Sequence, residues 1–225
     1  MSAELVDGGG QSVRRPRHLV AAPERRGAYA RWGKPVLDRA VAGAALAALL
    51  PMVLLVALVV LAEFGRPVLF RQRRVGLHGR HFTVYKFRTM LEDRRTTPSA
   101  DWDGVCRRQT HKSDDDPRHT RVGRLLRKTS LDELPQLWNV LVGDMSLVGP
   151  RPELVSVVER YEPWQHRRHA VKPGLTGLWQ VTARGDRPMH ELTHIDLEYV
   201  ASVSARNDLK LLLATPRALL SRSGS

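Results

Sequence analysis

Residues 40–62 read AVAGAALAALLPMVLLVALVVLA, a run of 23 residues without a charged or strongly polar side chain. A helix of this length reaches far enough to enter or cross a hydrocarbon core about 30 Å thick. The 39 residues that precede the run, and the lack of a clean small-x-small cleavage site after it, argue against a signal peptide. Buried helices of soluble proteins are usually shorter and rarely lack charge for so long. The run therefore predicts a helix embedded in a membrane.

The two flanks of this run carry equal positive charge. Residues 20–39 hold five Lys or Arg residues, and residues 63–82 hold another five. Because Lys and Arg mark the cytoplasmic flank of a spanning helix, both flanks are expected on the same side.

Pro51 divides the run into two apolar arms of about ten residues, each about 15 Å long as a helix and so half the thickness of the core. Proline removes one intrahelical hydrogen bond and clashes with the preceding turn. We therefore expect a helix–break–helix hairpin that enters one leaflet and returns. An ordinary span kinked at Pro51 is the alternative, since such helices tolerate proline.

Composition narrows the class of partner. The chain of 225 residues has 36 Lys and Arg against 23 Asp and Glu, a net charge of +13. Such a balance favours a polyanionic partner, namely nucleic acid, an anionic lipid surface or a phosphorylated substrate. No nucleic-acid module, Walker loop, dinucleotide glycine fingerprint or paired C-x-x-C is present, so we expect no nucleic-acid partner. The single cysteine, Cys106, cannot form an internal disulfide and fits a reducing compartment.

The remaining sequence predicts a mostly helical α+β protein in three parts. Residues 1–33 are expected to form a disordered basic tail, residues 34–64 the membrane helix, and residues 65–225 one folded domain. Short β-type runs around 68–70 and 82–85, with glycines between them, predict a hairpin. Residues 92–117 are polar and predict a loop. Helices are expected at 118–126, after Ser130, at 153–160, and, as amphipathic helices, at about 190–203 and 207–220 with Asn207 as an N-cap; residues 178–181 suggest a short strand.

The best local motif is Ser130-Leu131-Asp132-Glu133-Leu134-Pro135. Ser130 and Glu133 fit a capping box, which is a purely structural role, while Pro135 also allows the helix to start there. The same geometry has a chemical interpretation, because carboxylates at a helix N-terminus feel the positive end of the dipole and stay ionised. Two adjacent carboxylates could then divide the work of binding a metal and attacking a substrate.

Basic residues surround this acidic pair. Arginines suit phosphate oxygens because their planar forks bind two oxygens at once, although a solvated basic face is the alternative. The group comprises Arg118, Arg121, Arg124, Arg127 and Lys128 before the pair and Arg151, between two prolines, after it. The prolines stiffen the backbone that presents Arg151.

The segment His190-Glu191-Leu192-Thr193-His194 matches the H-E-x-x-H pattern of zinc proteases. Such a site needs a third ligand. The extended metalloprotease pattern fails because Leu197 stands where its glycine belongs, and no acid or histidine follows Asp208. We therefore interpret the segment as an exposed polar helix face.

Four blocks together resemble the bacterial sugar transferase family, the monotopic polyprenyl-phosphate phosphoglycosyl transferases. The central block runs from Lys128 through Ser130-Leu131-Asp132-Glu133-Leu134-Pro135 to Gly149-Pro150-Arg151-Pro152. The others span residues 65–90, including Lys86-Phe87-Arg88-Thr89-Met90, residues 116–118 and residues 172–177. The similarity covers about residues 34–220, in order.

This resemblance implies a fold, a reaction and a set of site residues. It implies a re-entrant helix broken at Pro51, with the catalytic domain on the cytoplasmic face of the plasma membrane, held by amphipathic interfacial helices and anionic lipids. It implies that Asp132 attacks the β-phosphorus of a nucleotide sugar, UDP-linked in the expected case, to give a covalent aspartyl phosphosugar. Polyprenyl (undecaprenyl) phosphate then takes the phosphosugar, as the first membrane step of glycan assembly. Mg²⁺ is expected at Glu133 and Asp132, and phosphate contacts are expected from Arg88, Arg118, Arg127, Arg151 and Arg184.

The sequence departs from the family pattern at three places. Leu50 rather than serine precedes Pro51, Val142 occupies a position that is commonly basic, and Thr182-Ala183 rather than glycine precedes Arg184. The chain resembles the small form of the family, for which no N-terminal multi-span domain is expected. A membrane-bound scaffold without catalysis is the alternative function. The sugar, the glycan pathway and the oligomeric state stay open.

Overall fold

The computed structural model describes residues 27–91, 120–183 and 189–221 of the chain. The helices and strands of these residues follow in chain order: α1 (Lys34–Phe64), β1 (Leu69–Val75), β2 (His81–Phe87), α3 (Arg121–Lys128), α4 (Gln136–Val142), β3 (Ser146–Val148), β4 (Glu153–Leu154), α5 (Val155–Val158), β5 (Gly174–Thr176), α6 (Leu178–Thr182), α7 (Thr193–Ala201) and α8 (Ala205–Ser221). Helix and strand together confirm the predicted α+β class with helix in excess.

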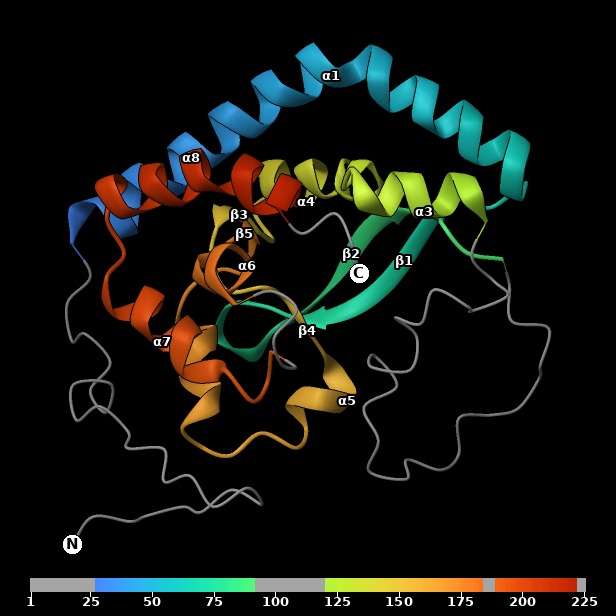
Figure 1. The fold of residues 1–225 in the computed structure, drawn as a ribbon. Coiled ribbons are helices and arrows are strands. Elements are labelled where there is room, and N and C mark those ends of the chain that lie inside the picture. Colours follow the sequence, from blue (N-terminus) through green and yellow to red (C-terminus); the bar gives the residue numbers. More distant parts are fainter. Residues whose placement is uncertain (1–26, 92–119, 184–188, 222–225) are drawn as a thin grey trace, which may run out of the picture.

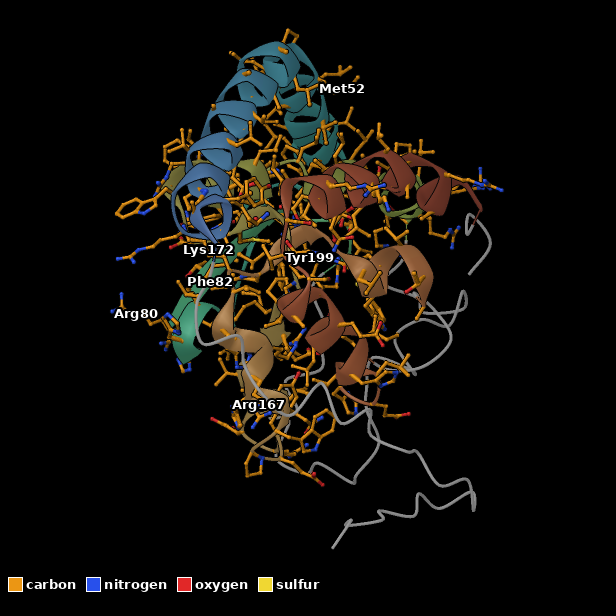
Figure 2. The ribbon with its side chains drawn as sticks, turned by 90° about the vertical axis from the view of Figure 1, so that its left-hand side faces the viewer. Met52, Arg80, Phe82, Arg167, Lys172 and Tyr199 are labelled. Atoms are coloured by element: carbon orange, nitrogen blue, oxygen red, sulfur yellow. The ribbon has the colours of Figure 1, made fainter. Side chains whose placement is uncertain are left out.

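Helix α1 is long and apolar enough to cross a membrane, judged by length and composition. It is helical from end to end, with Pro51 inside it, so the expected break is a bend within one continuous helix. Pro51 cannot donate to the carbonyl of Ala47, and such a missing bond allows a kink without ending the helix. The middle of α1 arches away from the molecule and both ends approach it (Figure 1), and Met52 lies near the apex (Figure 2).

Most of the large side chains of α1 are exposed around this arch, including Leu50, Leu54, Leu55 and Leu58. A helix with this much exposed apolar surface would be unfavourable in water, where soluble proteins rarely leave a large contiguous apolar patch uncovered. The exposed surface supports a lipid environment for α1. Re-entry into one leaflet stays a prediction.

Helices α8, α4 and α3 form a row beneath α1, and the two small sheets lie on the far side of this row (Figure 1). Two clusters of buried side chains connect the layers. Ala42 of α1 packs in one cluster with Val140 of α4 and Tyr199 of α7. Val56 and Val60 of α1 pack in the other with Phe87 of β2 and Leu126 of α3. Both arms of α1 are therefore packed against the domain.

The predicted hairpin is confirmed. Strands β1 and β2 pair antiparallel in a register that sets Leu69 opposite Phe87, and β4 adds to the other edge of β1. The turn between the hairpin strands uses Gly79 at φ +77°, a conformation that costs a side chain more than glycine.

A second sheet pairs β3 with β5 in parallel. Here Gly149 and Gly174 approach so closely that a Cβ on either would collide with the backbone of the other segment. The two glycines therefore allow the loop after β3 to lie directly against β5.

The first turns of α1 are tied to the rest of the molecule by buried polar side chains. Lys34 Nζ lies 2.6 Å from Asp208 Oδ2 in α8, and Tyr199 donates to the other oxygen of Asp208 at 2.8 Å. Ser146 of β3 donates to Asp38 at 2.6 Å. Because an unpaired buried charge is costly, these pairs hold the base of α1 against β3, α7 and α8.

Three local predictions were wrong. Residues 178–182 form helix α6 rather than a strand, because Trp179 and Ala183, four apart, share a helical face that packs on Met189. The expected helix at 153–160 is only α5, because Glu153 pairs with Val75 in β4. The last helix begins at Ala205, where Ser204 Oγ accepts from the Asn207 amide, so Ser204 rather than Asn207 caps it. Most of the predicted tail and the loop at 92–117 lie outside the described residues.

Candidate active site

The acidic pair lies in a short 3₁₀ turn, Leu131–Glu133, between α3 and α4. Ser130 enters this turn with φ +56° in the left-handed region, and its side chain makes no capping hydrogen bond. The capping box was therefore a wrong prediction, and only a backbone bond from the Glu133 amide to the Ser130 carbonyl joins the two residues. Helix α4 starts after Pro135, as the alternative interpretation of the motif allowed.

Glu133 is held by two cations from different parts of the chain. Lys86 Nζ of β2 lies 2.6 Å and Arg151 Nη2 lies 2.8 Å from the same oxygen, Glu133 Oε1. Burial by itself would raise the pKa of Glu133, but the charges of Arg151 and Lys86 outweigh burial and lower it below its ordinary value. Glu133 is therefore ionised at neutral pH.

Asp132 has the opposite electrostatic balance. Its side chain is buried, with 8 % of the residue exposed. Burial and then the negative charge of Glu133 raise its pKa to about 6, against the opposing charges of Lys86, Arg151 and Arg127. The two carboxylates therefore differ: the charges of Arg151 and Lys86 keep Glu133 ionised, whereas burial raises the pKa of Asp132. Asp132 instead titrates near neutral pH, in the range where an enzyme sets a reactive group.

Every carbonyl of the Pro150–Pro152 loop is engaged by a donor. Gly174 of β5 donates to Pro150 at 2.9 Å, Arg168 donates to Arg151 at 2.7 Å, and Arg74 of β1 donates to Pro152 at 3.3 Å. The two prolines restrict the backbone further. The loop therefore presents the Arg151 guanidinium to Glu133 from a rigid support.

Arg168 is itself fixed by a buried ion pair. Its Nε and Nη2 lie 2.9 and 2.6 Å from Asp196 Oδ2 in α7, and Tyr161 accepts a hydrogen bond from its Nη1 at 3.1 Å. Both members of the pair are almost fully buried. Arg168 therefore positions the backbone of Arg151 through its hydrogen bond to the Arg151 carbonyl. Arg168 lies outside the sequence motif that suggested the site.

The structure separates the predicted phosphate-binding arginines. Arg151 and Arg127 are near the acidic pair, because both lower the pKa of Asp132. Arg88 lies at the C-terminal end of α1, where it donates to the carbonyls of Gly65 at 3.2 Å and Arg66 at 3.4 Å. Those bonds suggest that Arg88 holds the end of the membrane helix. Arg118 and Arg184 lie outside the described residues, and a phosphate role for all three stays a prediction.

Sequence reasoning missed Lys86 as a site residue. It lies in β2, and burial lowers its pKa while the charge of Glu133 opposes that change. The Lys86-Phe87-Arg88 block of the family resemblance could have identified Lys86 as a site residue. However, no local feature of that block indicates that Lys86 contacts Glu133. Asn139 of α4 explains why Lys86 lies near Glu133. Its side chain accepts a hydrogen bond from the Tyr85 amide at 3.2 Å and donates one to the Thr83 carbonyl at 2.7 Å. These two bonds dock α4 on β2 and bring Lys86 beside the acidic turn.

The acidic pair has the donor chemistry that Mg²⁺ requires. Mg²⁺ prefers hard oxygen ligands and is commonly held by one or two carboxylates together with substrate phosphates. Lys86 and Arg151 both contact the same oxygen of Glu133, Oε1, and the Asp132 carboxylate is adjacent in the chain. The residues therefore fit a magnesium ion that binds with a phosphorylated substrate.

The H-E-x-x-H segment does not form a metal site in the described part of the chain. Helix α7 begins only at Thr193, so His190 and Glu191 lie in a turn, and the expected polar helix face is not formed. Gln165 and Thr193 both donate to the His190 carbonyl. Among residues 27–91, 120–183 and 189–221, no group of three His, Cys, Asp or Glu side chains could hold a metal.

A cavity of about 260 Å³ opens beside the acidic pair. Glu133 and Arg151 line it together with Leu134 and Leu137 of the α4 segment. Its remaining walls come from β3, β5, α6 and one face of α8. The site thus combines a charged centre with an apolar chamber.

Fold and site together define a membrane-associated protein with a buried acidic pair under two fixed cations. The comparison with protein families identifies the class. The family model described as "Bacterial sugar transferase" matches residues 29–222, and the chain belongs to this family.

Two relatives match this chain over most of both lengths. The "Uncharacterized sugar transferase EpsL" of Bacillus subtilis is 45% identical over 74% of this chain and 76% of its own length. The "Exopolysaccharide production protein ExoY" of Rhizobium meliloti is 39% identical over 89% of this chain and 92% of its own.

Other relatives are much longer than the region they share. The "Undecaprenyl-phosphate galactose phosphotransferase" of Salmonella typhimurium is 42% identical over 72% of this chain but only 35% of its own length. The chain thus spans about a third of that relative.

Proposed function

We propose that this protein transfers a phosphosugar from a nucleotide diphosphate sugar to polyprenyl phosphate at a membrane surface. The observation that carries the proposal is the buried Asp132–Glu133 pair, in which Lys86 and Arg151 bind Glu133. The flanking Leu131 and Leu134 pack on the cluster that holds Val56 and Val60 of the apolar helix α1. A soluble nucleotide and a lipid phosphate can meet only at an interface, which α1 supplies. The names of the Salmonella relative and of the "UDP-galactose-lipid carrier transferase" of Erwinia amylovora favour UDP-galactose as the first donor to test.

In the first step an oxygen of the Asp132 carboxylate attacks the β-phosphorus of the nucleotide sugar. A new bond between that oxygen and phosphorus forms, and the bond to the bridging oxygen breaks. The nucleoside monophosphate leaves with that oxygen and its negative charge. Phosphoryl transfer of this kind depends mainly on positioning and charge stabilisation, which suits the fixed guanidinium of Arg151.

In the second step a phosphate oxygen of polyprenyl phosphate attacks the same phosphorus. The bond to Asp132 breaks and its carboxylate is restored. The product is a polyprenyl diphosphate sugar. Because Asp132 is a weaker acid than an exposed aspartate, it is also a better nucleophile when ionised, and it still ionises close to neutral pH.

Mg²⁺ would be held by Glu133 and Asp132 and would neutralise charge on the substrate phosphates. Glu133 suits this task because it stays ionised next to Arg151 and Lys86. The two cations orient its carboxylate through Oε1.

The test is the Mg²⁺-dependent release of a nucleoside monophosphate from a panel of nucleotide sugars, with purified protein in lipid nanodiscs. Without acceptor, a sugar-labelled donor should leave label covalently on the protein. Asp132→Asn keeps the shape of the side chain but removes the attacking charge, so we expect no covalent label and a turnover reduced by orders of magnitude. Label on Asp132→Asn would exclude Asp132 as the nucleophile.

A non-catalytic scaffold is the competing function. It predicts that no nucleotide sugar is consumed by the wild-type protein, with or without Mg²⁺. Release of a nucleoside monophosphate that depends on Asp132 would exclude the scaffold.

A further inference from the structure

The cavity beside the acidic pair has mainly apolar walls. Six aliphatic side chains contribute to its lining: Leu134, Leu137, Leu147, Leu175, Val181 and Leu212. A nucleoside diphosphate offers charge and hydrogen-bonding groups over most of its surface, and burying them against leucine and valine would be costly. The lining instead matches a hydrocarbon group attached to a phosphate.

Helix α8 supplies one wall of the cavity through Leu212, Thr215 and Ala218. Their spacing of three residues places them on one face of the helix. Thr215 is held to Thr176 of β5 by a hydroxyl–hydroxyl contact of 2.8 Å, which fixes that wall. Leu209 and Leu213 of the same helix are exposed, Leu213 by 73%. Exposed leucines therefore extend the apolar surface of α8 beyond the cavity, and α8 itself runs beneath the first arm of α1 (Figure 1).

The size of the cavity limits its occupant. About 260 Å³ exceeds the roughly 150 Å³ of an apolar cavity that holds benzene, a six-carbon group. The space suits about two five-carbon isoprene units. It falls below the range of about 300–1,000 Å³ that is typical of sites for drug-sized ligands, which a complete nucleotide sugar would need.

We propose that this cavity binds the phosphate-proximal isoprene units of the polyprenyl phosphate acceptor, with the lipid phosphate at Arg151 and the rest of the chain leaving over α8. The proposal rests on the proposed function and extends it by assigning the acceptor site. Arg151 lines the cavity and also contacts Glu133, the chain neighbour of Asp132, so a lipid phosphate at Arg151 would lie beside the acidic pair. A nucleotide sugar is the competing occupant of the cavity. Gln180 Oε1 would suit the hydroxyl groups of such a sugar, because this buried acceptor has no hydrogen-bond partner among the described residues.

The test is to fill the cavity. Leu212→Trp adds bulk at a residue that is 38% exposed, so the helix can accommodate the larger ring at its edge while the cavity narrows. We expect the KM for polyprenyl phosphate to rise by about tenfold or more, since hydrophobic pockets discriminate small changes in bulk by such factors. The KM for the nucleotide sugar and the covalent labelling of Asp132 without acceptor should stay unchanged.

Lys210→Trp is the control, because it places the same ring at an exposed residue of α8 that lies outside both the cavity lining and the apolar surface of Leu209 and Leu213. It should leave both KM values unchanged. Val181→Phe repeats the filling from α6 and guards against a folding defect in Leu212→Trp. If both filling variants keep the wild-type KM for the lipid, or if they raise the KM for the nucleotide sugar instead, the acceptor assignment is wrong.

A binding measurement separates this inference from the proposed reaction. A polyprenyl phosphate with a photoreactive diazirine on its second isoprene unit should crosslink to residues 175–181 or 212–218, and Leu212→Trp should reduce the yield. Crosslinking at these residues without any turnover would contradict the reaction and keep the lipid site. Normal turnover with crosslinks only elsewhere would contradict the lipid site and keep the reaction.

Discussion

At the scale of single residues, the site depends on two carboxylates with the same surroundings and opposite pKa shifts. Glu133 touches both cations directly, so their charges overcome its burial. For Asp132, burial and the charge of Glu133 outweigh the same cations. Adjacent carboxylates whose pKa values are pushed apart are a common way to assign separate chemical roles. This division favours Glu133 as the metal ligand and Asp132 as the nucleophile.

The pKa of Asp132 leads to a prediction about pH dependence. Only the ionised carboxylate attacks, so the rate of covalent labelling should fall as the pH drops through about 6. Lys86 lowers this pKa, so replacing it by methionine should raise the pKa and move the acid limb of the profile to higher pH, by about one pH unit. The pH dependence of single-turnover labelling measures this limb.

Arg80→Met is the control for this experiment, because Arg80 is exposed and is not among the charges that shift the pKa of Asp132. Its profile should match that of the wild type. An acid limb that stays in place in Lys86→Met would mean that Lys86 does not act on Asp132.

The Arg168–Asp196 pair leads to a second prediction at this scale. Asp196→Asn leaves the buried Arg168 charge uncompensated, which should lower the free energy of unfolding by about 3 kcal/mol. Arg168→Lys keeps a charge near Asp196 but loses the planar fork that reaches both Asp196 and the Arg151 carbonyl. We expect Arg168→Lys to raise the KM for the nucleotide sugar. Its loss of thermal stability should be smaller than that of Asp196→Asn.

Circular dichroism during heating and steady-state kinetics measure these two effects. Glu198→Gln, an exposed change on the same helix, should alter neither. An Arg168→Lys variant with wild-type kinetics would show that the Arg151 loop does not need this support.

At the scale of elements, α1 shows how a proline can shape a helix without interrupting it. The helix continues through Pro51 because its other hydrogen bonds remain, and the packing of both arms against the domain stabilises the bend. Leu50, which departs from the family pattern, leaves no serine hydroxyl to take part in that bend. We therefore attribute the arch to the missing bond at Pro51 and to the packing of the two arms.

Pro51→Ala should restore the missing hydrogen bond and straighten α1. Spin labels at Leu37→Cys and Leu61→Cys, in a Cys106→Ser background, should then move apart toward about 36 Å, the length of 24 residues of straight helix. Labels at Leu37→Cys and Leu49→Cys lie within one arm and should keep the same distance. Equal distances between the outer labels with and without Pro51 would show that packing alone bends the helix.

At the scale of the whole molecule, both ends of α1 approach the same domain (Figure 1). Lys34 at one end binds Asp208 of α8, and Gly65 at the other accepts from Arg88. The equal charge of the two flanks adds an independent reason for keeping them on one face of the membrane. These contacts support the re-entrant arrangement, which we propose with the domain on the cytoplasmic side.

Cysteine labelling in intact cells tests this topology. Single cysteines at Ala28 and Arg206, in a Cys106→Ser background, should both resist a membrane-impermeant reagent and react after lysis. A cysteine at Ala28 that reacts in intact cells while Arg206→Cys does not would mean that α1 spans the membrane.

The sequence by itself determined the features that depend on short-range chemistry. The apolar run, a distortion at Pro51, the β1–β2 hairpin and the position of the acidic pair could be predicted, because apolar period, proline sterics and turn residues act over a few positions. The continuous helix through Pro51 and the 3₁₀ turn at Asp132 and Glu133 differed from what was expected. Arg151 could be predicted as well, because its two prolines are neighbours in the chain.

Only the tertiary structure decided which distant residues meet. Lys86 and Arg168 became part of the site because Asn139 docks α4 on β2 and Asp196 holds Arg168 against the Arg151 loop. The helical form of residues 178–182 depends on burial against Met189, which local preference does not contain. Charges separated by 47 residues, as Lys86 and Glu133 are, interact strongly only once folding has excluded water between them. For that reason the raised pKa of Asp132 depends on the tertiary structure and could not be derived from the motif.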